Sequence, residues 1–268
     1  MKKLILLILL IPSLCFGAEP LEIAWMNVPT IAGAGVAAAS TAFCTDATHD
    51  KNNNAVVFCE DFEGDQKCNA AAGAASKCRA EKHFVDSTTC STEPVYDYGT
   101  ALAGNYSVYF SESSNGGGCA KRIDSNTRSS SYIYLRMKIN TITGIDDAGE
   151  VQNIINIGGR CMMRVGWDGD SVQFSVYSDS EAWGTTPGYP TAGTEYHIWL
   201  EFVKNQATNG CQLFVNTTSA KPELPEAKTA GTNFDSTYVD ITSYDFGYDI
   251  DDIVYDNILF NTSALGSQ

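Results

Sequence analysis

Aromatic and polar side chains alternate with apolar ones along several segments, and these are the residues best suited to chemistry. In the segment 196–203 the alternation leaves His197, Trp199 and Glu201 on one face and apolar residues on the other. Flat rings stack on the apolar side of a pyranose, and amides and guanidinium groups bind its hydroxyls. The candidate ligand-binding residues of these types are Tyr134, Arg136, Gln152, Arg164, Gln173, Tyr177, Trp183, His197 and Trp199. For each aromatic residue, simple coverage of a sheet face is the alternative interpretation.

Short strands separated by Gly, Asn and Asp turns must position these side chains. Strand signals occur at 56–63, 106–110, 132–139, 151–157, 161–167, 172–177, 196–203, 212–216 and 253–260. In the segment 132–139, Ile133, Leu135, Met137 and Ile139 share one face. The pattern predicts an all-β fold of two antiparallel sheets packed as a jelly-roll sandwich.

The first residues resemble an export signal. Lys2 and Lys3 precede an apolar run over 4–11, which is too short to span a bilayer because a membrane helix needs about 20 apolar residues. We predict a signal peptide at 1–17, a secreted or periplasmic location and no membrane insertion. Lipidation of Cys15 is disfavoured by Leu14 before it. The Ala- and Gly-rich segment 18–54 is interpreted as a lead-in or tether, with 19–43 as a possible oligomer contact, and 55–268 as one domain.

Cysteine usage agrees with export. Nine cysteines occur, and eight remain once Cys15 leaves with the signal peptide. An even number in an exported chain predicts up to four disulfides, and zinc is disfavoured because no C-x-x-C pair occurs. Eight cysteines allow 105 pairings, so the pairs Cys161–Cys211 and Cys68–Cys78 are hypotheses only.

The charge of the chain limits its partners. The formal net charge is −15, and it becomes −17 when Lys2 and Lys3 are removed with the signal peptide. Such an acidic protein repels phosphate backbones, so nucleic acid is not an expected partner.

Several segments resemble the concanavalin A-like lectin/glucanase superfamily, including its laminin-G-like members. The segment Phe58-Cys59-Glu60-Asp61-Phe62-Glu63-Gly64 resembles the first strand of these domains, and Asp252-Ile253-Val254-Tyr255-Asp256-Asn257-Ile258-Leu259 resembles the last. The segments 195–202 and 211–216 resemble a strand pair between them. The resemblance covers about residues 55–262 and implies a jelly roll of two antiparallel sheets. Its members include sugar-binding modules, glucanases and polysaccharide lyases, so the fold does not decide activity.

The chemistry of the enzymatic members is not matched. Glucanases of this fold carry Glu-x-Asp-x-Glu on one strand, whereas this chain has Glu150, Gln152 and Ile154 at that spacing. A lyase needs a Tyr or His base and an Arg or Gln to neutralise a uronate. Arg136, Gln152, Arg164 and His197 supply these types, but the Gln-x-His motif is absent. Convergence of His197, Arg136 and Gln152 in one cleft is the arrangement that would favour a lyase.

The resemblance also implies a structural calcium ion where the first and last strands meet. The matching residues are Asp61, Glu63, the Gly64 carbonyl and Asp256, and hard oxygen ligands of this kind suit Ca²⁺.

Together these features favour a secreted, non-catalytic module that binds a polysaccharide or surface glycan. The alternatives are a polysaccharide lyase or glycoside hydrolase of the same fold, and a structural or assembly module of a cell surface or virion.

Overall fold

The computed structural model describes residues 43–45, 55–62, 84, 86–90, 94, 101–104, 107–110, 119–143, 145, 147, 150–186, 189–243 and 249–268. Residues 40–268 form one compact unit. The predicted signal peptide 1–17 and oligomer contact lie outside the described residues, apart from Phe43 at the edge of the latter. Within the described part of the chain, no helix is long and apolar enough to cross a membrane.

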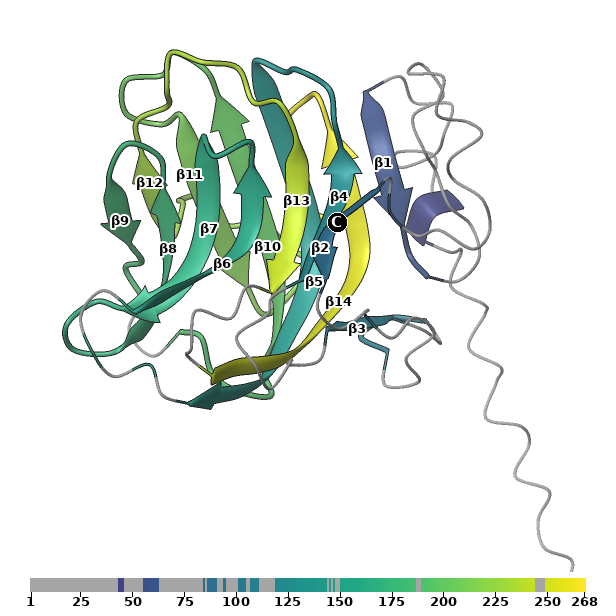
Figure 1. Cartoon of the computed structure of the whole chain (residues 1–268), viewed down its shortest axis with the longest axis vertical. Coiled ribbons are helices and arrows are strands. Elements are labelled where there is room, and N and C mark those ends of the chain that lie inside the picture. The colour runs from purple at the N-terminus through teal and green to yellow at the C-terminus, as the bar shows by residue number, and fades with distance from the viewer. Residues whose placement is uncertain are drawn as a thin grey trace, which may run out of the picture. The chain divides into compact units, whose positions relative to one another are not determined.

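Two antiparallel sheets pack face to face, which confirms the predicted sandwich (Figure 1). Sheet A has the order β1-β14-β5-β10-β11-β12, with β3 paired to β14, and sheet B has the order β2-β4-β13-β6-β7-β8-β9. The bounds are β1 Val56–Glu60, β2 Asp86–Cys90, β3 Val108–Phe110, β4 Cys119–Asp124, β5 Ser130–Thr143, β6 Val151–Ile157, β7 Cys161–Trp167, β8 Val172–Tyr177, β9 Glu181–Trp183, β10 Glu195–Val203, β11 Cys211–Asn216, β12 Ala227–Thr229, β13 Val239–Ser243 and β14 Asp249–Asn261. A short 3-10 turn, η1, spans Phe43–Thr45.

The alternating residues build the core between the sheets. Ile133, Leu135, Met137 and Ile139 of β5 are all fully buried in the main cluster, as the period of two predicts. Strand β10 contributes Tyr196, Ile198, Leu200 and Phe202 to the same cluster. The other face of each strand therefore points away from this core.

Disulfides link the elements of the sandwich. Cys161 of β7 bonds to Cys211 of β11, so this disulfide joins sheet B to sheet A and confirms the first predicted pair. Cys44 of η1 bonds to Cys59 of β1, a pair that the sequence did not suggest. Cys119 is also disulfide-bonded. The predicted pair Cys68–Cys78 lies outside the described residues.

A second apolar cluster covers the outer face of sheet A. One row of register partners crosses five strands there and consists of Cys59, Leu259, Tyr134, Trp199 and Phe214. Cys44 and Phe43 of η1 and Leu265 near the C-terminus pack against this row. Sheet A is therefore apolar on both faces at this row, because other parts of the same chain lie over it.

Candidate functional site

The candidate ligand-binding residues separate into two groups and one outlier. Tyr134, Arg136, His197 and Trp199 lie on the outer face of sheet A. Arg164, Gln173, Tyr177 and Trp183 lie on the outer face of sheet B. Gln152 is the register partner of the core residue Val165, so it lies on the inner side of sheet B. No single site can contain all nine residues.

Tyr134 and Trp199 are not accessible for sugar stacking, which corrects their predicted role. Tyr134 is 1 % exposed and Trp199 is 0 % exposed. Their ring centroids lie 5.2 Å apart, and the Trp199 indole donates a hydrogen bond to the Gly266 carbonyl at 3.1 Å. The alternation placed both residues on the outer face correctly, but η1 and the C-terminal segment cover them there.

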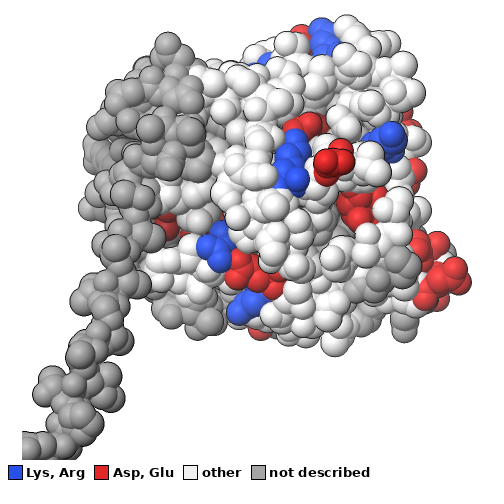
Figure 2. All heavy atoms as spheres, turned by 180° about the vertical axis from the view of Figure 1, so that it is seen from behind, with Lys and Arg blue, Asp and Glu red and all other residues white. Residues whose placement is uncertain are grey.

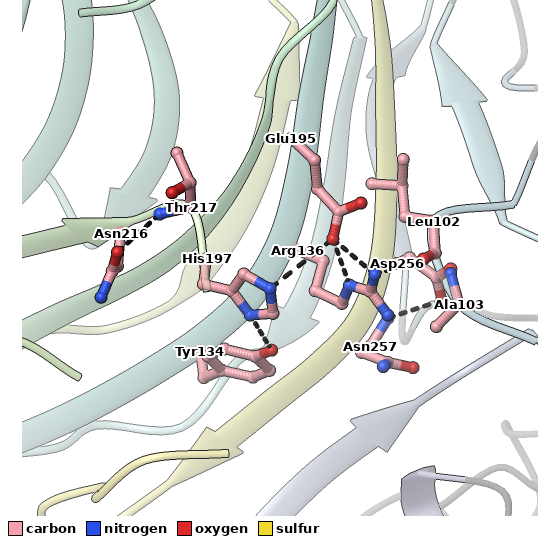
Figure 3. A network of polar contacts seen from close by, with 10 residues as sticks. All are labelled: Leu102, Ala103, Tyr134, Arg136, Glu195, His197, Asn216, Thr217, Asp256 and Asn257. Carbon is pink, nitrogen blue, oxygen red and sulfur yellow. Dashed lines mark hydrogen bonds and ion pairs between the residues drawn. The ribbon is translucent and has the colours of Figure 1, made fainter. Parts of the chain in front are cut away.

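A polar row lies beside this cluster on the same face (Figure 3). Arg136, His197 and Asn216 are register partners across β5, β10 and β11, and Asp256 of β14 pairs with Arg136. The Arg136 Nε donates to Glu195 Oε1 at 2.8 Å, and its Nη2 contacts the same oxygen and the Leu102 carbonyl. Two of the three guanidinium nitrogens are therefore bound by the protein itself.

His197 is neutral in this setting. Burial lowers its pKa below the ordinary value of 6.5, and the neighbouring Arg136 lowers it further, while Glu195 acts in the opposite direction. The His197 Nδ1 lies 2.7 Å from the Tyr134 hydroxyl, whose pKa is raised by burial, so the phenol stays protonated. His197 Nε2 is 3.6 Å from Glu195 Oε1, which is beyond hydrogen-bond distance.

The lowered pKa of His197 predicts a loss of stability in acid. In the unfolded state the imidazole has its ordinary pKa of 6.5, above the folded pKa, so the unfolded state binds more protons as the pH falls through this range. The free energy of unfolding should fall as the pH decreases through the folded pKa. Urea denaturation between about pH 7 and pH 5 tests this, since the span covers the ordinary titration range of histidine.

The variant His197→Gln provides the control for that experiment. It should have a flatter dependence of unfolding free energy on pH across the same range, because the titrating ring is gone. Identical pH profiles for the two proteins would contradict a neutral His197.

The arrangement that would favour a lyase is not formed. His197 and Arg136 are register partners on the outer face of sheet A, whereas Gln152 lies on the inner side of sheet B. The three residues therefore do not share a cleft. Gln152 also loses its predicted ligand-binding role, since it is 1 % exposed.

The outer face of sheet B brings the second group together. Asn153, Arg164, Ser175 and Trp183 are register partners in one row across β6, β7, β8 and β9. Tyr177 and Glu181 form a pair in the next row, and Gln173 precedes Ser175 by two positions on β8. We call these seven residues the β6–β9 face.

Arg164 is held at the centre of the β6–β9 face. Its Nε donates to Asn153 Oδ1 at 2.9 Å, and its Nη1 donates to Glu181 Oε2 at 2.7 Å. The guanidinium carbon lies 4.0 Å from the centroid of the Tyr177 ring. One face of that ring is thus occupied, so Tyr177 positions Arg164 rather than offering a free stacking surface on that side.

Asn153, Ser175 and Glu181 were missed by the sequence analysis. Ser175 donates to Glu181, which fixes the carboxylate that holds Arg164. The alternation of β8 places Ser175 beside Gln173 and Tyr177, and this was the available signal. Nothing in the sequence near Asn153 or Glu181 marks them as site residues. Only the strand register and the hydrogen bonds show that both contact Arg164.

The β6–β9 face keeps one partly exposed ring without a stacking partner and one buried acceptor without a hydrogen-bond partner. Trp183 is half-buried, and within the described part of the chain no aromatic ring or cation stacks on it. Gln173 is 5 % exposed, its Nε2 donates to Ser171 Oγ at 3.1 Å, and its Oε1 has no hydrogen-bond partner. A buried acceptor of this kind is costly unless a donor reaches it.

The segment after Trp183 is fixed by a buried carboxylate. Glu226 accepts hydrogen bonds from the Thr186 backbone N–H and from the Thr186 hydroxyl, both at 2.7 Å. The Gly184 N–H donates to the Phe174 carbonyl at 2.8 Å. Trp183 therefore stands on a constrained strand end and is pre-positioned.

The predicted calcium ligands are only partly described. Asp61 Oδ2 accepts the Cys44 N–H at 2.9 Å, and Asp256 accepts the N–H groups of Ala103 and Asn257, each at 2.7 Å. Glu63 and Gly64 lie outside the described residues. Among the residues described, no group of three His, Cys, Asp or Glu is placed to hold a metal ion. Calcium therefore stays a prediction.

Comparisons with known proteins assign no family. No protein-family model matches the chain, and no curated protein matches it. Similar solved structures include the binding domain of Paraclostridial Mosquitocidal Protein 1, with 12 % identity and a TM-score of 0.48, covering 79 % of this chain and 50 % of that chain. This chain thus spans half the length of that protein chain.

Two further similar structures have comparable scores. Domain 4 of AbnA, an extracellular arabinanase from Geobacillus stearothermophilus, in complex with arabinotriose, has 12 % identity and a TM-score of 0.46, covering 80 % of this chain and 93 % of that chain. A cellulose-induced protein has 15 % identity and a TM-score of 0.45, covering 68 % and 92 % respectively. At these scores the similarities assign neither a family nor a ligand.

Proposed function

We propose that this chain is an exported, non-catalytic carbohydrate-binding module that binds a polysaccharide or surface glycan through the β6–β9 face. The observation that carries the proposal is the half-buried Trp183 indole, on which no ring or cation of the described residues stacks, beside Ser175 and the unpaired amide oxygen of Gln173 on the same strand surface. This is the combination that binds a sugar ring and its hydroxyls.

The opposite side of the sandwich supports the choice of face. On sheet A, the aromatic row is covered by η1 and by residues near the C-terminus. Lys221 holds that C-terminal segment through the Leu265 carbonyl at 3.0 Å and contacts Glu201. The aromatic rings of this row of sheet A therefore serve stability, and on sheet B the Trp183 ring is left for a ligand.

The distribution of charge supports a ligand other than nucleic acid. On the side of the molecule shown in Figure 2, basic and acidic side chains lie next to one another on a mostly uncharged surface. Ion pairs such as Arg136–Glu195 and Lys204–Asp235 illustrate this local compensation. A phosphate backbone would require unpaired cations along a groove. The disulfides support export, because they persist in oxidising compartments.

Trp183→Ala tests the proposed function. The purified chain is run in native gels containing soluble polysaccharides, and retardation measures the affinity for each polymer. Loss of the indole should weaken binding to a retarding polymer by about tenfold or more, as expected for an aromatic anchor at a binding surface.

The matched control is Phe234→Ala. Phe234 is an exposed aromatic residue (61 % exposed) in the loop after β12, where Arg160 stacks on it at 4.7 Å. This variant should bind like the unmodified chain. Equal retardation of the Trp183→Ala variant and the unmodified chain would contradict binding through the β6–β9 face.

A further inference from the structure

We infer that the β6–β9 face selects neutral polysaccharides and rejects polyuronates and sulfated glycans; this inference rests on the proposed function of the same face. Its basis is that each arginine on the outer face of sheet B is already bound to a carboxylate of the protein. A carboxylate or sulfate of a ligand therefore finds no free cation among the described residues of this face.

Arg164 is the central case. Its ion pair with Glu181 is 2.7 Å long, and the two side chains are 16 % and 23 % exposed. Asn153 and Tyr177 hold the guanidinium from two other directions. Glu181 already neutralises the guanidinium, and it also accepts the Ser175 hydroxyl. An incoming carboxylate would either lie close to Glu181 and be repelled by it, or replace Glu181 and leave that carboxylate without its partner, so neither arrangement provides a net gain.

The neighbouring arginine of the same sheet is compensated in the same way. Arg122 of β4 binds Asp240 of β13 through two hydrogen bonds of 2.8 and 3.0 Å, and it stacks on Tyr238 at 4.5 Å. Asp240 pairs with Asn156 of β6, so this ion pair adjoins the β6–β9 face. Arg160, in the turn between β6 and β7, is not one of the seven residues of the face, and its guanidinium stacks on Phe234 at 4.7 Å.

Carboxylates lie at the turns that border the face. Asp168 and Asp170 are exposed in the turn between β7 and β8, and Asp179 is exposed in the turn between β8 and β9. The backbone N–H groups of Asp170 and Ser171 donate to Asp168 Oδ1, both at 2.8 Å, and these bonds lower the pKa of that carboxyl. With a net charge of −15, the chain repels a polyanion as it approaches.

The groups left for a ligand favour hydroxyls. Gln173 Oε1 is a buried acceptor without a partner, and a hydroxyl that reached it would donate the missing hydrogen bond. Trp183 supplies an uncharged stacking surface next to Ser175, two positions from Gln173 on β8. A neutral hexose or pentose unit satisfies both groups without bringing charge to the face.

Affinity gels with two classes of polymer test the inference. The neutral class is mixed-linkage glucan, arabinan, xylan and galactomannan, and the anionic class is alginate, polygalacturonate and chondroitin sulfate, each at low and at high salt. We expect retardation by at least one neutral polymer at both salt concentrations, lost in Trp183→Ala, and none by the anionic class. Retardation by a polyanion that salt abolishes and Trp183→Ala removes would overturn the neutral selectivity while supporting the proposed function.

Glu181→Gln tests the charge argument directly. The substitution removes the negative charge paired with Arg164, so polygalacturonate at low salt should retard this variant although it does not retard the unmodified chain. Glu195→Gln is the matched control, because it releases Arg136 on the other outer face and should produce no such gain. Equal behaviour of the two variants would overturn the assignment of selectivity to Arg164. No retardation by any polymer would overturn the proposed function together with the inference.

Discussion

Trp199→Ala should lower the free energy of unfolding by about 3–5 kcal/mol, the range typical of a buried Trp replaced by Ala. Trp199 is fully buried in the cluster that covers sheet A, between its register partners Tyr134 and Phe214. The substitution removes the contacts of the indole with these rings and leaves a cavity. It also removes the donor to the Gly266 carbonyl.

Urea denaturation of the two tryptophan variants measures this difference. Trp183→Ala should change the unfolding free energy by less than about 1 kcal/mol, because Trp183 is only half-buried on an outer face. Glycan binding should show the reverse pattern. Trp183→Ala should lose binding, and the folded fraction of Trp199→Ala should bind as the unmodified chain does. A Trp199→Ala protein of normal stability that has lost binding would show that Trp199, and not Trp183, contacts the ligand.

Removing the Cys161–Cys211 disulfide should cost about 4 kcal/mol of unfolding free energy. The two residues are 50 positions apart, and the chain-entropy model assigns about this value to a loop of that length. The bond joins β7 of one sheet to β11 of the other, and its loss gives the unfolded chain more conformational freedom. The double variant Cys161→Ala/Cys211→Ala tests this by urea denaturation.

The matched control is the variant Cys44→Ala/Cys59→Ala. This disulfide closes a loop of only 15 positions, for which the same model gives about 3 kcal/mol. A larger loss for the Cys44/Cys59 variant than for the Cys161/Cys211 variant would contradict a dominant effect of loop length. Such a result would indicate that the Cys44–Cys59 bond contributes mainly by holding η1 over the outer face of sheet A.

The strand pattern could be predicted because alternation is a local property. Ile133, Leu135, Met137 and Ile139 all reach the main core, as their spacing of two requires. Cys161 and Cys211 begin two strands whose inner residues are apolar, and their pairing was confirmed. In contrast, the partner of Cys59 could not be found from strand pattern, because Cys44 lies in a short turn outside any strand.

The sequence alone therefore determined an all-β chain and which side chains share a face of each strand. Only the tertiary structure decided what lies over each face. Trp199 and Trp183 both point away from the main core, yet η1 and the C-terminal segment cover Trp199 and leave Trp183 half-exposed. Gln152, predicted to bind a ligand, lies on the inner face of sheet B, as its pairing with the core residue Val165 shows. Register and coverage join residues that are distant along the chain, so no local period can encode them.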